Sequence, residues 1–421
     1  MSEAATHRLR EIFEEYMEDR FVRPQTPKAD RRLAEVRKLL DEGADATQFP
    51  LLIECCASRC LRAVQWMVKA GADVNQQGEG MWNPTPLMMT ANAPQITRFL
   101  LKKGANVAAR TSQGDTVLHK QLGTLYGHIA SRESIQLLLE AGADLTARNN
   151  DGETPLLHAA DRAPIEVIEL LLEAGADITA VDRKGRTALD INSWDKRDEV
   201  LARAWLERLR QVPINDTDEA GRTLLMKAPG SLVVIRDYLK RGANPHAVDL
   251  SGMTALMHHA RSSNDRCEIL EIFIKEYQVD REVIDNTGMT ALLYAIKEGY
   301  YQHGIKFLTW GCDPHVVDGA GNGAFHHVVE NSGWRIIFPK LVEAGVDPDR
   351  QNRQGHTPLM KALQHGDLIL MEWLINAGAR KGGYRDQDGR SPADYLEAHI
   401  EEKGKHWTAE FRDKMRGSLY S

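Results

Sequence analysis

The stretch ALMHHARSSNDRC, residues 255–267, places two adjacent histidines before a cysteine. Imidazole and thiolate groups are preferred zinc ligands, and a cysteine near a histidine is also the arrangement of a catalytic nucleophile with its base. A nucleophile needs a matched His–Asp arrangement, and Cys267 has none at a recognisable spacing. The roles of His258 and His259 therefore depend on the elements that position them.

Three further cysteines occur together in ECCASRC, where residues 56 and 60 are one helical turn apart. A zinc site needs a fourth ligand and usually a second paired-ligand motif, and no such motif follows in the sequence. The segment GEGMWNP lacks the Lys-Ser/Thr ending of a phosphate-binding loop. We therefore predict no metal, no cofactor and no catalytic residue. The cysteines with predicted core positions are Cys55, Cys56 and Cys60.

The composition limits the class of protein. Of the 421 residues, 42% are hydrophobic and 27% are charged, which is typical of globular proteins. The net charge of −7 gives no basic character, so nucleic acid is not an expected partner. No apolar run approaches the roughly 18 residues of a membrane span, and the first residues lack the apolar segment of a secretory signal. Five cysteines without a disulfide-like framework favour a reducing, cytoplasmic compartment.

The elements that carry these residues repeat along the chain. A Gly-x-Thr motif or a close variant recurs at spacings of 31 to 38 residues, as in DGETPLLHAA and SGMTALMHHA. Most units close about twenty residues later with a Gly-Ala-Asp motif or a variant of it. The residues in the threonine position are Thr85, Thr116, Thr154, Thr187, Thr223, Thr254, Thr290, Gly323, Thr357 and Ser391.

Each part of the repeat has a physical role. The threonine hydroxyl can cap free N–H groups at the start of a short first helix, and proline suits its first turn. The run EVIELLLEAG carries the apolar stripe of a second helix, which Gly175 ends because a left-handed C-cap favours glycine. The segment ADITAVDRKGR then predicts an extended finger, with Asp182 capping the local backbone and Gly185 at the bend. Neighbouring units must stack because no unit can bury its apolar face alone.

This pattern resembles the ankyrin repeat family, whose unit of about 33 residues contains Thr-Pro-Leu-His-x-Ala. The resemblance covers roughly residues 30–392. It implies an all-α repeat solenoid of about eleven helix-turn-helix units with β-hairpin fingers and helical caps. His119 and His326 occupy the histidine position of the motif, where the resemblance implies bonds to the backbone between repeats. His259 occupies a small-residue position, where a buried imidazole needs partners.

Departures from the repeat predict the domain organisation. Residues 197–215 indicate a lengthened second helix and a nonstandard joint, and residues 276–286 also suggest a longer helix. Residues 124–134 predict an enlarged loop, and amphipathic helices at 9–21 and 393–415 predict solvated caps. The predicted domains are an N-terminal cap at 1–29, an N-terminal sub-stack at 30–211, a C-terminal sub-stack at 212–386, and a degenerate repeat with its cap at 387–421.

The repeat places His258 in a column with one residue from each of several first helices. The resemblance implies that these helices line the concave side of the stack. The column is either variable and merely half-exposed, or a mildly basic and aromatic stripe that recognises an acidic partner surface. Its candidate contacts are Lys120, His158, Lys227, His258, Tyr294, His327 and Lys361.

The finger tips supply a second set of candidate partner contacts. Members of the resembled family recognise proteins through their finger tips as well as their concave face. An exposed tryptophan is a common anchor at interfaces, and GEGMWNP carries one. The candidate tip contacts are Trp82, Gln113, Asn150, Lys184, Leu250, Asn286 and Arg353.

Repeats and caps occupy almost the whole chain and leave no segment large enough for a catalytic domain. With the resemblance, this predicts a non-catalytic, monomeric scaffold for protein–protein interaction, whose preformed groove loses little entropy on binding. An alternative is a bacterial-type immunity or adaptor protein that binds and neutralises or delivers a toxin or effector. A remote alternative is an enzyme with a His/Cys site built on the repeats. If the histidines meet acidic partner groups, affinity weakens as pH rises through their titration range.

Overall fold

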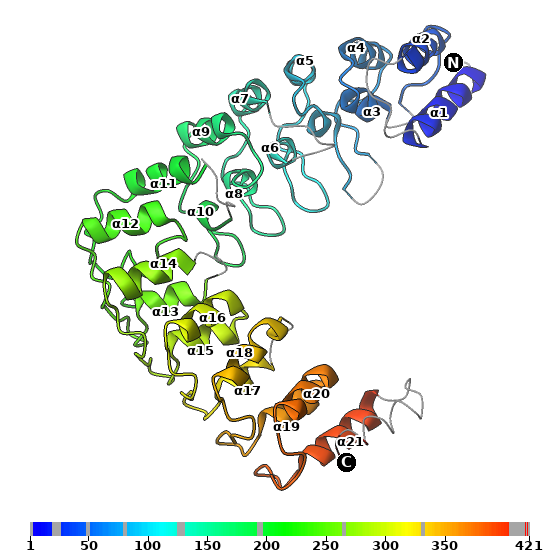
Figure 1. The fold of residues 1–421 in the computed structure, drawn as a ribbon. Helices are drawn as coiled ribbons and strands as arrows, with labels where there is room; N and C mark the ends of the chain where they lie inside the picture. The colour runs from blue at the N-terminus through cyan, green and yellow to red at the C-terminus, as the bar shows by residue number, and fades with distance from the viewer. Residues whose placement is uncertain are drawn as a thin grey trace. The chain divides into compact units, whose positions relative to one another are not determined.

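The computed structural model describes residues 3–18, 27–47, 51–78, 82–123, 131–191, 197–262, 267–329 and 333–403, together with 417 and 419. The chain divides into two compact units, residues 1–211 and 212–421 (Figure 1). The predicted cap boundaries at residues 29 and 386 stay predictions.

Unit 1 contains two rows of helices that pack against each other (Figure 1). The short first row consists of α3 (Leu51–Ala57), η1 (Pro86–Met89), α6 (Val117–Leu122), α8 (Pro155–Ala159) and α10 (Ala188–Ile191). The longer second row consists of α4 (Leu61–Lys69), α5 (Pro94–Lys102), α7 (Arg132–Glu140), α9 (Ile165–Glu173) and α11 (Arg197–Arg208). Consecutive helices within each row are neighbours, which is the arrangement of a repeat stack.

Unit 2 has the same two-row organisation. Its first row consists of α13 (Ala255–Ala260), α15 (Ala291–Lys297), α17 (Ala324–Val328), α19 (Pro358–His365) and α21 (Pro392–Lys403). The second row consists of α12 (Leu232–Lys240), α14 (Cys267–Glu271) with η3 (Ile272–Glu276), α16 (Tyr301–Thr309), η4 (Trp334–Ile336) with α18 (Phe338–Glu343), and α20 (Leu368–Asn376).

Threonine caps the first-row helices α6, α8, α13, α15 and α19, as the motif predicts. The Thr154 hydroxyl accepts a hydrogen bond from the Leu157 N–H, and Thr254 caps the Met257 N–H in the same way. Each cap satisfies an N–H group that has no partner inside the helix. At the other end of the unit, Gly175 follows α9 with φ +93°, so the predicted left-handed C-cap is confirmed.

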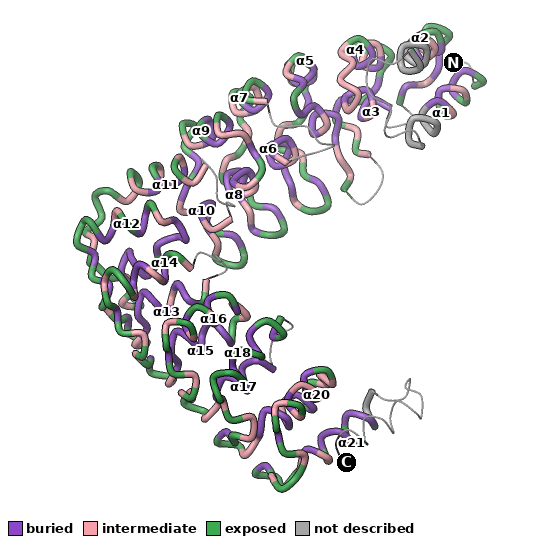
Figure 2. The backbone as a smooth tube through the Cα atoms, viewed as in Figure 1, coloured by how far each residue is buried: buried purple, intermediate pink, exposed green. Residues whose placement is uncertain are grey.

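Apolar side chains of both rows form the core of each unit. Leu156 of α8 and Ile168 of α9 are almost fully buried. Figure 2 shows buried residues in the helices of both rows and exposed residues at the turns. Burial of this kind contributes roughly 25 cal/mol per Å² of apolar surface removed from water. In unit 2, Leu396 of α21 and Leu419 near the C-terminus pack with Leu359 of α19 in one buried cluster.

The fingers that join the units are tight turns. Among the described residues, β-structure is limited to two isolated antiparallel bridges, Arg110–Thr116 and Val248–Thr254. The predicted hairpin fingers therefore close through their turns and contain no extended strands in this part of the chain. Gly185 has φ +76°, which fits the bend predicted at that residue.

The irregular units differ in part from their predicted form. Helix α11 has 12 residues and ends at Arg208, so it is longer than the nine-residue α9 but shorter than the predicted 197–215 segment. The helix after α14 changes to a π-helical turn, η3, and does not extend further. Gln278 then takes φ +50°, the left-handed conformation that glycine supplies in other units. Residues 124–130 of the predicted enlarged loop lie outside the described part.

The terminal helices cover the ends of their units. Helix α1 (Glu3–Glu18) buries Leu9 and Ile12, and its Arg8 Nε donates to Glu35 of α2 (Pro27–Asp41) at 2.8 Å. Helix α2 crosses the boundary predicted at residue 29. The predicted face residues Phe13, Tyr16, Met17 and Phe21, and residues 404–415 of the C-terminal helix, lie outside the described side chains or residues.

Candidate functional site

A polar residue, in most cases an aspartate, stands at the start of the finger turn and organises the tip. Asp249 Oδ1 accepts hydrogen bonds from the backbone N–H groups of Ser251 at 2.8 Å and Met253 at 3.0 Å. We call this residue the loop aspartate of its finger. The two bonds fix the turn because they satisfy N–H groups two and four residues further along the chain. Loop residues that make the same pair of bonds are Asp182, Asp218, Asp285, Asp318, Asn149 and Asn352.

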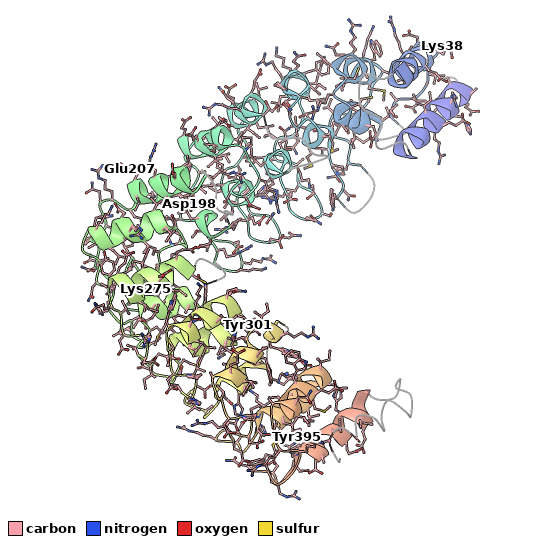
Figure 3. The ribbon with its side chains drawn as sticks, in the orientation of Figure 1. Lys38, Asp198, Glu207, Lys275, Tyr301 and Tyr395 are labelled. Carbon is pink, nitrogen blue, oxygen red and sulfur yellow. The ribbon has the colours of Figure 1, made fainter. Side chains whose placement is uncertain are left out.

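The second carboxylate oxygen faces the first helix of the same unit. Asp249 Oδ2 accepts a hydrogen bond from His258 Nε2 at 2.8 Å, nine residues further along. The same spacing joins Tyr294 Oη to Asp285 Oδ2 at 2.5 Å. Both His258 and Tyr294 are members of the predicted column. Further pairs at this spacing are Lys227 with Asp218 at 3.3 Å, His327 with Asp318 at 3.2 Å, and Tyr395 of α21 with Asp386 at 2.5 Å, with Tyr395 labelled in Figure 3.

Two units of unit 1 obtain the carboxylate from another position. Their loop residues are Thr111 and Asn149, which offer no second anionic oxygen. His158 Nδ1 instead lies 2.9 Å from Glu153 Oε2, and Lys120 Nζ lies 3.7 Å from Asp115 Oδ2. The column residue thus keeps an acidic partner from its own finger although the loop aspartate is replaced.

Burial and hydrogen bonding set the protonation state of these pairs. Burial lowers the pKa of His258 and outweighs the opposing effect of Asp249. Burial also acts to raise the pKa of Asp249, but bonds from His258 and the backbone lower it overall. At neutral pH the pair is therefore a neutral imidazole donating to a carboxylate. In the pair with His158, the imidazole hydrogen bond lowers the pKa of Glu153 to about 2.

The predicted column is therefore largely engaged inside its own repeats. Tyr294 and His327 are buried and Lys227 is exposed, while the other four members are half-buried. These four are Lys120, His158, His258 and Lys361. A partner would have to compete with the finger carboxylates for these groups. Lys227 is the most accessible of the seven because it is the exposed member. The role of the column in partner recognition stays a prediction.

Hydrogen bonds between backbone groups connect each tip to its neighbour. Within each unit, the residue after a loop residue donates its N–H to a carbonyl of the preceding finger, as Leu250 does to Ala220 at 3.0 Å. This ladder aligns the tips that it joins. The other donor–acceptor pairs are Asn150–Gln113, Arg183–Asp151, Asn286–Ser251, Gly319–Thr287, Arg353–Ala320 and Gln387–Gln354.

The side chains predicted at the tips are exposed, but they differ in how they are held. Leu250 is 73% exposed. The Asn150 and Asn286 amides donate to carbonyls of the preceding finger, at 3.2 and 3.1 Å. No ion pair of Lys184 or Arg353 is found within the described ranges. The exposed tip residues are Gln113, Asn150, Lys184, Leu250, Asn286 and Arg353.

Trp82 lies on the tip that precedes Thr85 and is 42% exposed. The ammonium of Lys120 lies 4.5 Å from the centroid of its ring, within the range of a cation–π contact. The structure therefore brings together one predicted tip contact and one predicted column contact. Sequence alone placed them in separate sets.

The position before the loop residue was missed by the sequence interpretation. Arg110 Nη1 donates to Gly114 O in its own turn and to Arg148 O in the next finger, both at 2.9 Å. Gln351 makes the equivalent pair of bonds, to Gly355 O and Arg385 O. We call this residue the staple residue because it joins two fingers. The signal available in the sequence was a long polar donor directly before the loop residue.

The histidines outside the column have structural contacts. His119 Nε2 lies 2.9 Å from Glu153 O and His326 Nε2 lies 3.0 Å from His356 O, so their predicted bonds between repeats are confirmed. His259 is buried and lies 3.1 Å from Leu225 O in the preceding unit, which is the partner that its position required.

The cysteines do not gather into a site. Cys55, Cys56 and Cys312 are buried, and Cys60 and Cys267 are half-buried. Burial raises the pKa of Cys55 to about 12, which disfavours the thiolate. Among the described residues, no three His, Cys, Asp or Glu side chains lie close enough together to hold a metal ion. No helix in the described ranges is long and apolar enough to span a membrane.

Stacked two-helix units with capped first helices and laddered tips define a repeat solenoid. The repeats in the matched parts of the chain are ankyrin repeats. A family model described as "Ankyrin repeats (3 copies)" matches residues 124–203 and 228–318, and one described as "Ankyrin repeats (many copies)" matches residues 340–375. The resemblance inferred from the sequence is therefore confirmed, while the number of units stays a prediction.

Known proteins share ankyrin repeats with parts of this chain. The "B-cell lymphoma 3 protein homolog" of Mus musculus is 29% identical over 151 residues, which is 35% of this chain and 34% of that protein. "Rabankyrin-5" of Mus musculus is 30% identical over 149 residues, 35% of this chain and 12% of that protein. "Protein phosphatase 1 regulatory subunit 27" of Homo sapiens is 36% identical over 84 residues, 20% of this chain and 54% of that protein. Each match thus spans about half or less of the relative.

Proposed function

We propose that this chain is a non-catalytic scaffold that binds a partner protein through its finger tips and the exposed part of its first-helix row. Ankyrin repeats in general bind proteins, which supports the broad role. The docking surface, the absence of catalysis, the monomeric state and the cytoplasmic location belong to the proposal. So does an acidic surface on the partner.

The division of bonds within a finger carries the proposal. The loop residue and the backbone ladder hold the turns from which Leu250 and Arg353 extend, and no side-chain hydrogen bond or ion pair of these two residues is found within the described ranges. Leu250 and Arg353 project from turns that are already fixed, and both are exposed. Such a surface loses little conformational entropy on binding because its backbone is ordered beforehand.

Affinity capture from native lysate, followed by identification of the bound proteins, tests the proposal. The tip variants Leu250→Asp and Arg353→Glu should each release a partner that the unaltered chain retains. A second-row variant, Val233→Asp, is a matched control. Val233 is 42% exposed on α12, and it belongs to a helix and not to a finger turn. A partner retained by both tip variants and lost with the control would contradict docking at the tips.

The first-helix row is tested separately through Lys227, the most accessible member of the column. Lys227→Ala should weaken capture if the column contacts the partner. Equal capture with and without this side chain would confine docking to the tips. The immunity or adaptor role and the enzyme built on repeats stay predictions, because no contact in the structure favours either of them.

A further inference from the structure

Three exposed apolar side chains occupy two adjacent tips in unit 2. Val248, Leu250 and Ile284 are 54%, 73% and 59% exposed. Val248 and Leu250 flank the buried Asp249. Ile284 precedes Asp285 as Val248 precedes Asp249, and Asn286 N–H donates to Ser251 O between the two fingers. The three side chains therefore belong to neighbouring tips of one face, which is the row of finger tips that the backbone ladder joins.

At two of these positions the side chains cannot join neighbouring fingers. Val248 and Ile284 hold the staple position, where Arg110 and Gln351 join neighbouring fingers through two hydrogen bonds each. A valine or isoleucine cannot make those bonds and leaves apolar surface in water instead. Exposed apolar side chains that cluster on neighbouring tips indicate a binding surface.

The same face becomes cationic further along unit 2. Arg353 follows the loop residue Asn352, in the position of Leu250, and Arg385 precedes Asp386, in the position of Val248. Both arginines are exposed. Arg385 Nη1 donates to Gly389 O within its own finger, as staple residues do, and within the described ranges neither arginine has a carboxylate partner at ion-pair distance. Arginine guanidinium groups without such a partner favour a ligand that brings its own carboxylates. The backbone ladder connects all the fingers of this face.

We propose that this face binds an extended segment of a partner protein, whose apolar side chains contact Val248, Leu250 and Ile284 and whose carboxylates pair with Arg353 and Arg385. The inference rests on the proposed binding function and specifies the chemistry of the partner. The order of the contacts fixes the order along the segment, with apolar residues at one end and acidic residues at the other. A basic segment does not fit, because it would meet the two arginines.

Selection from a random-peptide phage library against the full chain tests the inference. Enriched sequences should combine apolar residues with Asp or Glu, and a synthetic peptide of the most enriched sequence serves as the probe for fluorescence anisotropy. The double change Leu250→Asp and Ile284→Asp should weaken its binding about tenfold or more, since a loss of 1.4 kcal/mol corresponds to a factor of ten. Arg353→Glu should weaken it several-fold and reduce its salt dependence.

Val181→Asp is the matched control, because Val181 holds the same position in a finger of unit 1 and is 40% exposed. It should leave the affinity unchanged. Circular dichroism spectra and thermal transitions should coincide for all variants, since no altered side chain is buried. Peptides that are basic, or that bind the double variant as well as the unaltered chain, would overturn the inference while leaving the broader binding function intact. A library without binders would also overturn it, and the capture experiment then decides the broader function by itself.

Discussion

The ammonium of Lys120 lies over the ring of Trp82, 4.5 Å from its centroid. Lys120 belongs to the first helix of one repeat and Trp82 to the finger tip of the preceding repeat, so the contact joins neighbouring repeats. The lysine also lies 3.7 Å from Asp115 Oδ2, which leaves it between an anion and an aromatic face. Trp82 is thereby an anchored residue as well as an exposed one.

The coupling between Trp82 and Lys120 should be measurable. A double-mutant cycle with Trp82→Leu and Lys120→Met should give a coupling free energy of unfolding of about 0.5–1 kcal/mol, the size of an exposed cation–π contact. Urea denaturation of the four proteins provides the measurement. A second cycle, in which a change at Phe99 takes the role of the change at Trp82, is the control. Additive effects of Trp82→Leu and Lys120→Met would show that the contact contributes nothing to stability.

The two oxygens of the loop aspartate should be separable by mutation. Asp249→Asn keeps an oxygen for the Ser251 and Met253 N–H groups, as Asn149 and Asn352 do in their own fingers, and changes only the contact with His258. Asp249→Ala removes both functions. We expect the unfolding free energy to fall by about 1 kcal/mol for Asn and about 3 kcal/mol for Ala, because each lost hydrogen bond costs about 1 kcal/mol.

Denaturant unfolding of the two Asp249 variants checks this ranking. Equal losses for Asn and Ala would mean that the Oδ1 bonds do not stabilise the turn. A change confined to Ala would instead mean that the His258 contact has no net value.

Buried histidines should make the protein less stable in mild acid. Burial lowers the pKa of His119, His259 and His326 to about 4 in the folded chain, against about 6.5 when unfolded. Below pH 6.5 these histidines take up protons in the unfolded chain but not in the folded chain. The free energy of unfolding therefore falls as pH falls towards 4. Each histidine contributes up to about 1.4 kcal/mol per pH unit in this window.

The range between pH 6.5 and 5 isolates the histidines, because carboxylates with lowered pKa values take up protons in the unfolded chain mainly below it. His259→Gln keeps a donor for Leu225 O but does not titrate. Its unfolding free energy should therefore vary less with pH, by roughly 1 kcal/mol per unit at the steepest point. An unchanged slope would show that His259 titrates normally in the folded protein.

Restoring the threonine that one repeat lacks should stabilise unit 2. Gly323 occupies the threonine position before α17, and because glycine has no side chain, no hydroxyl caps this helix. Its φ of −93° is one that threonine also adopts. A Cβ there would lie 3.7 Å from Val317 Cγ1 and 3.8 Å from Arg350 Cδ, which is ordinary contact. Gly323→Thr should raise the unfolding free energy by about 0.5–1.5 kcal/mol, through the cap and the lower entropy of the unfolded chain.

The converse change, Thr290→Gly before α15, should cost a similar amount, because Thr290 accepts a bond from the Leu293 N–H. Thermal unfolding followed by circular dichroism compares the pair. A destabilising Gly323→Thr would indicate that the backbone at this repeat cannot accept the cap.

The repeat could be predicted from the sequence because each of its signals is local. Thr154 caps a helix three residues away, and Gly175 turns the chain at a fixed distance from the helix it ends. These effects act within one unit and recur in register. The π-helical turn at Ile272–Glu276 was not predictable in this way, since no periodic signal marks the extra residue in the helix.

The candidate site was only partly predictable, because its decisive contacts join separate positions. The column containing His258 was identified, but its pairing with Asp249 nine residues earlier depends on how the finger folds back on the helix. The staple position was missed because Arg110 reaches the carbonyl of Arg148 in the next finger, a contact 38 residues away. A sequence pattern predicts which face of a helix or finger a residue occupies, whereas the residues that it contacts depend on how the repeats stack.

The alternation around the loop aspartate separates stability from surface chemistry within three consecutive residues. Asp249 holds the turn and the helix, while Val248 and Leu250 on either side determine what the surface displays. Substitutions at the flanking positions of this finger can therefore change the preferred ligand without removing a bond that maintains the fold. A chain of such fingers can acquire new specificity one residue at a time, and unit 2 offers a template on which selectivity can be redesigned at constant architecture.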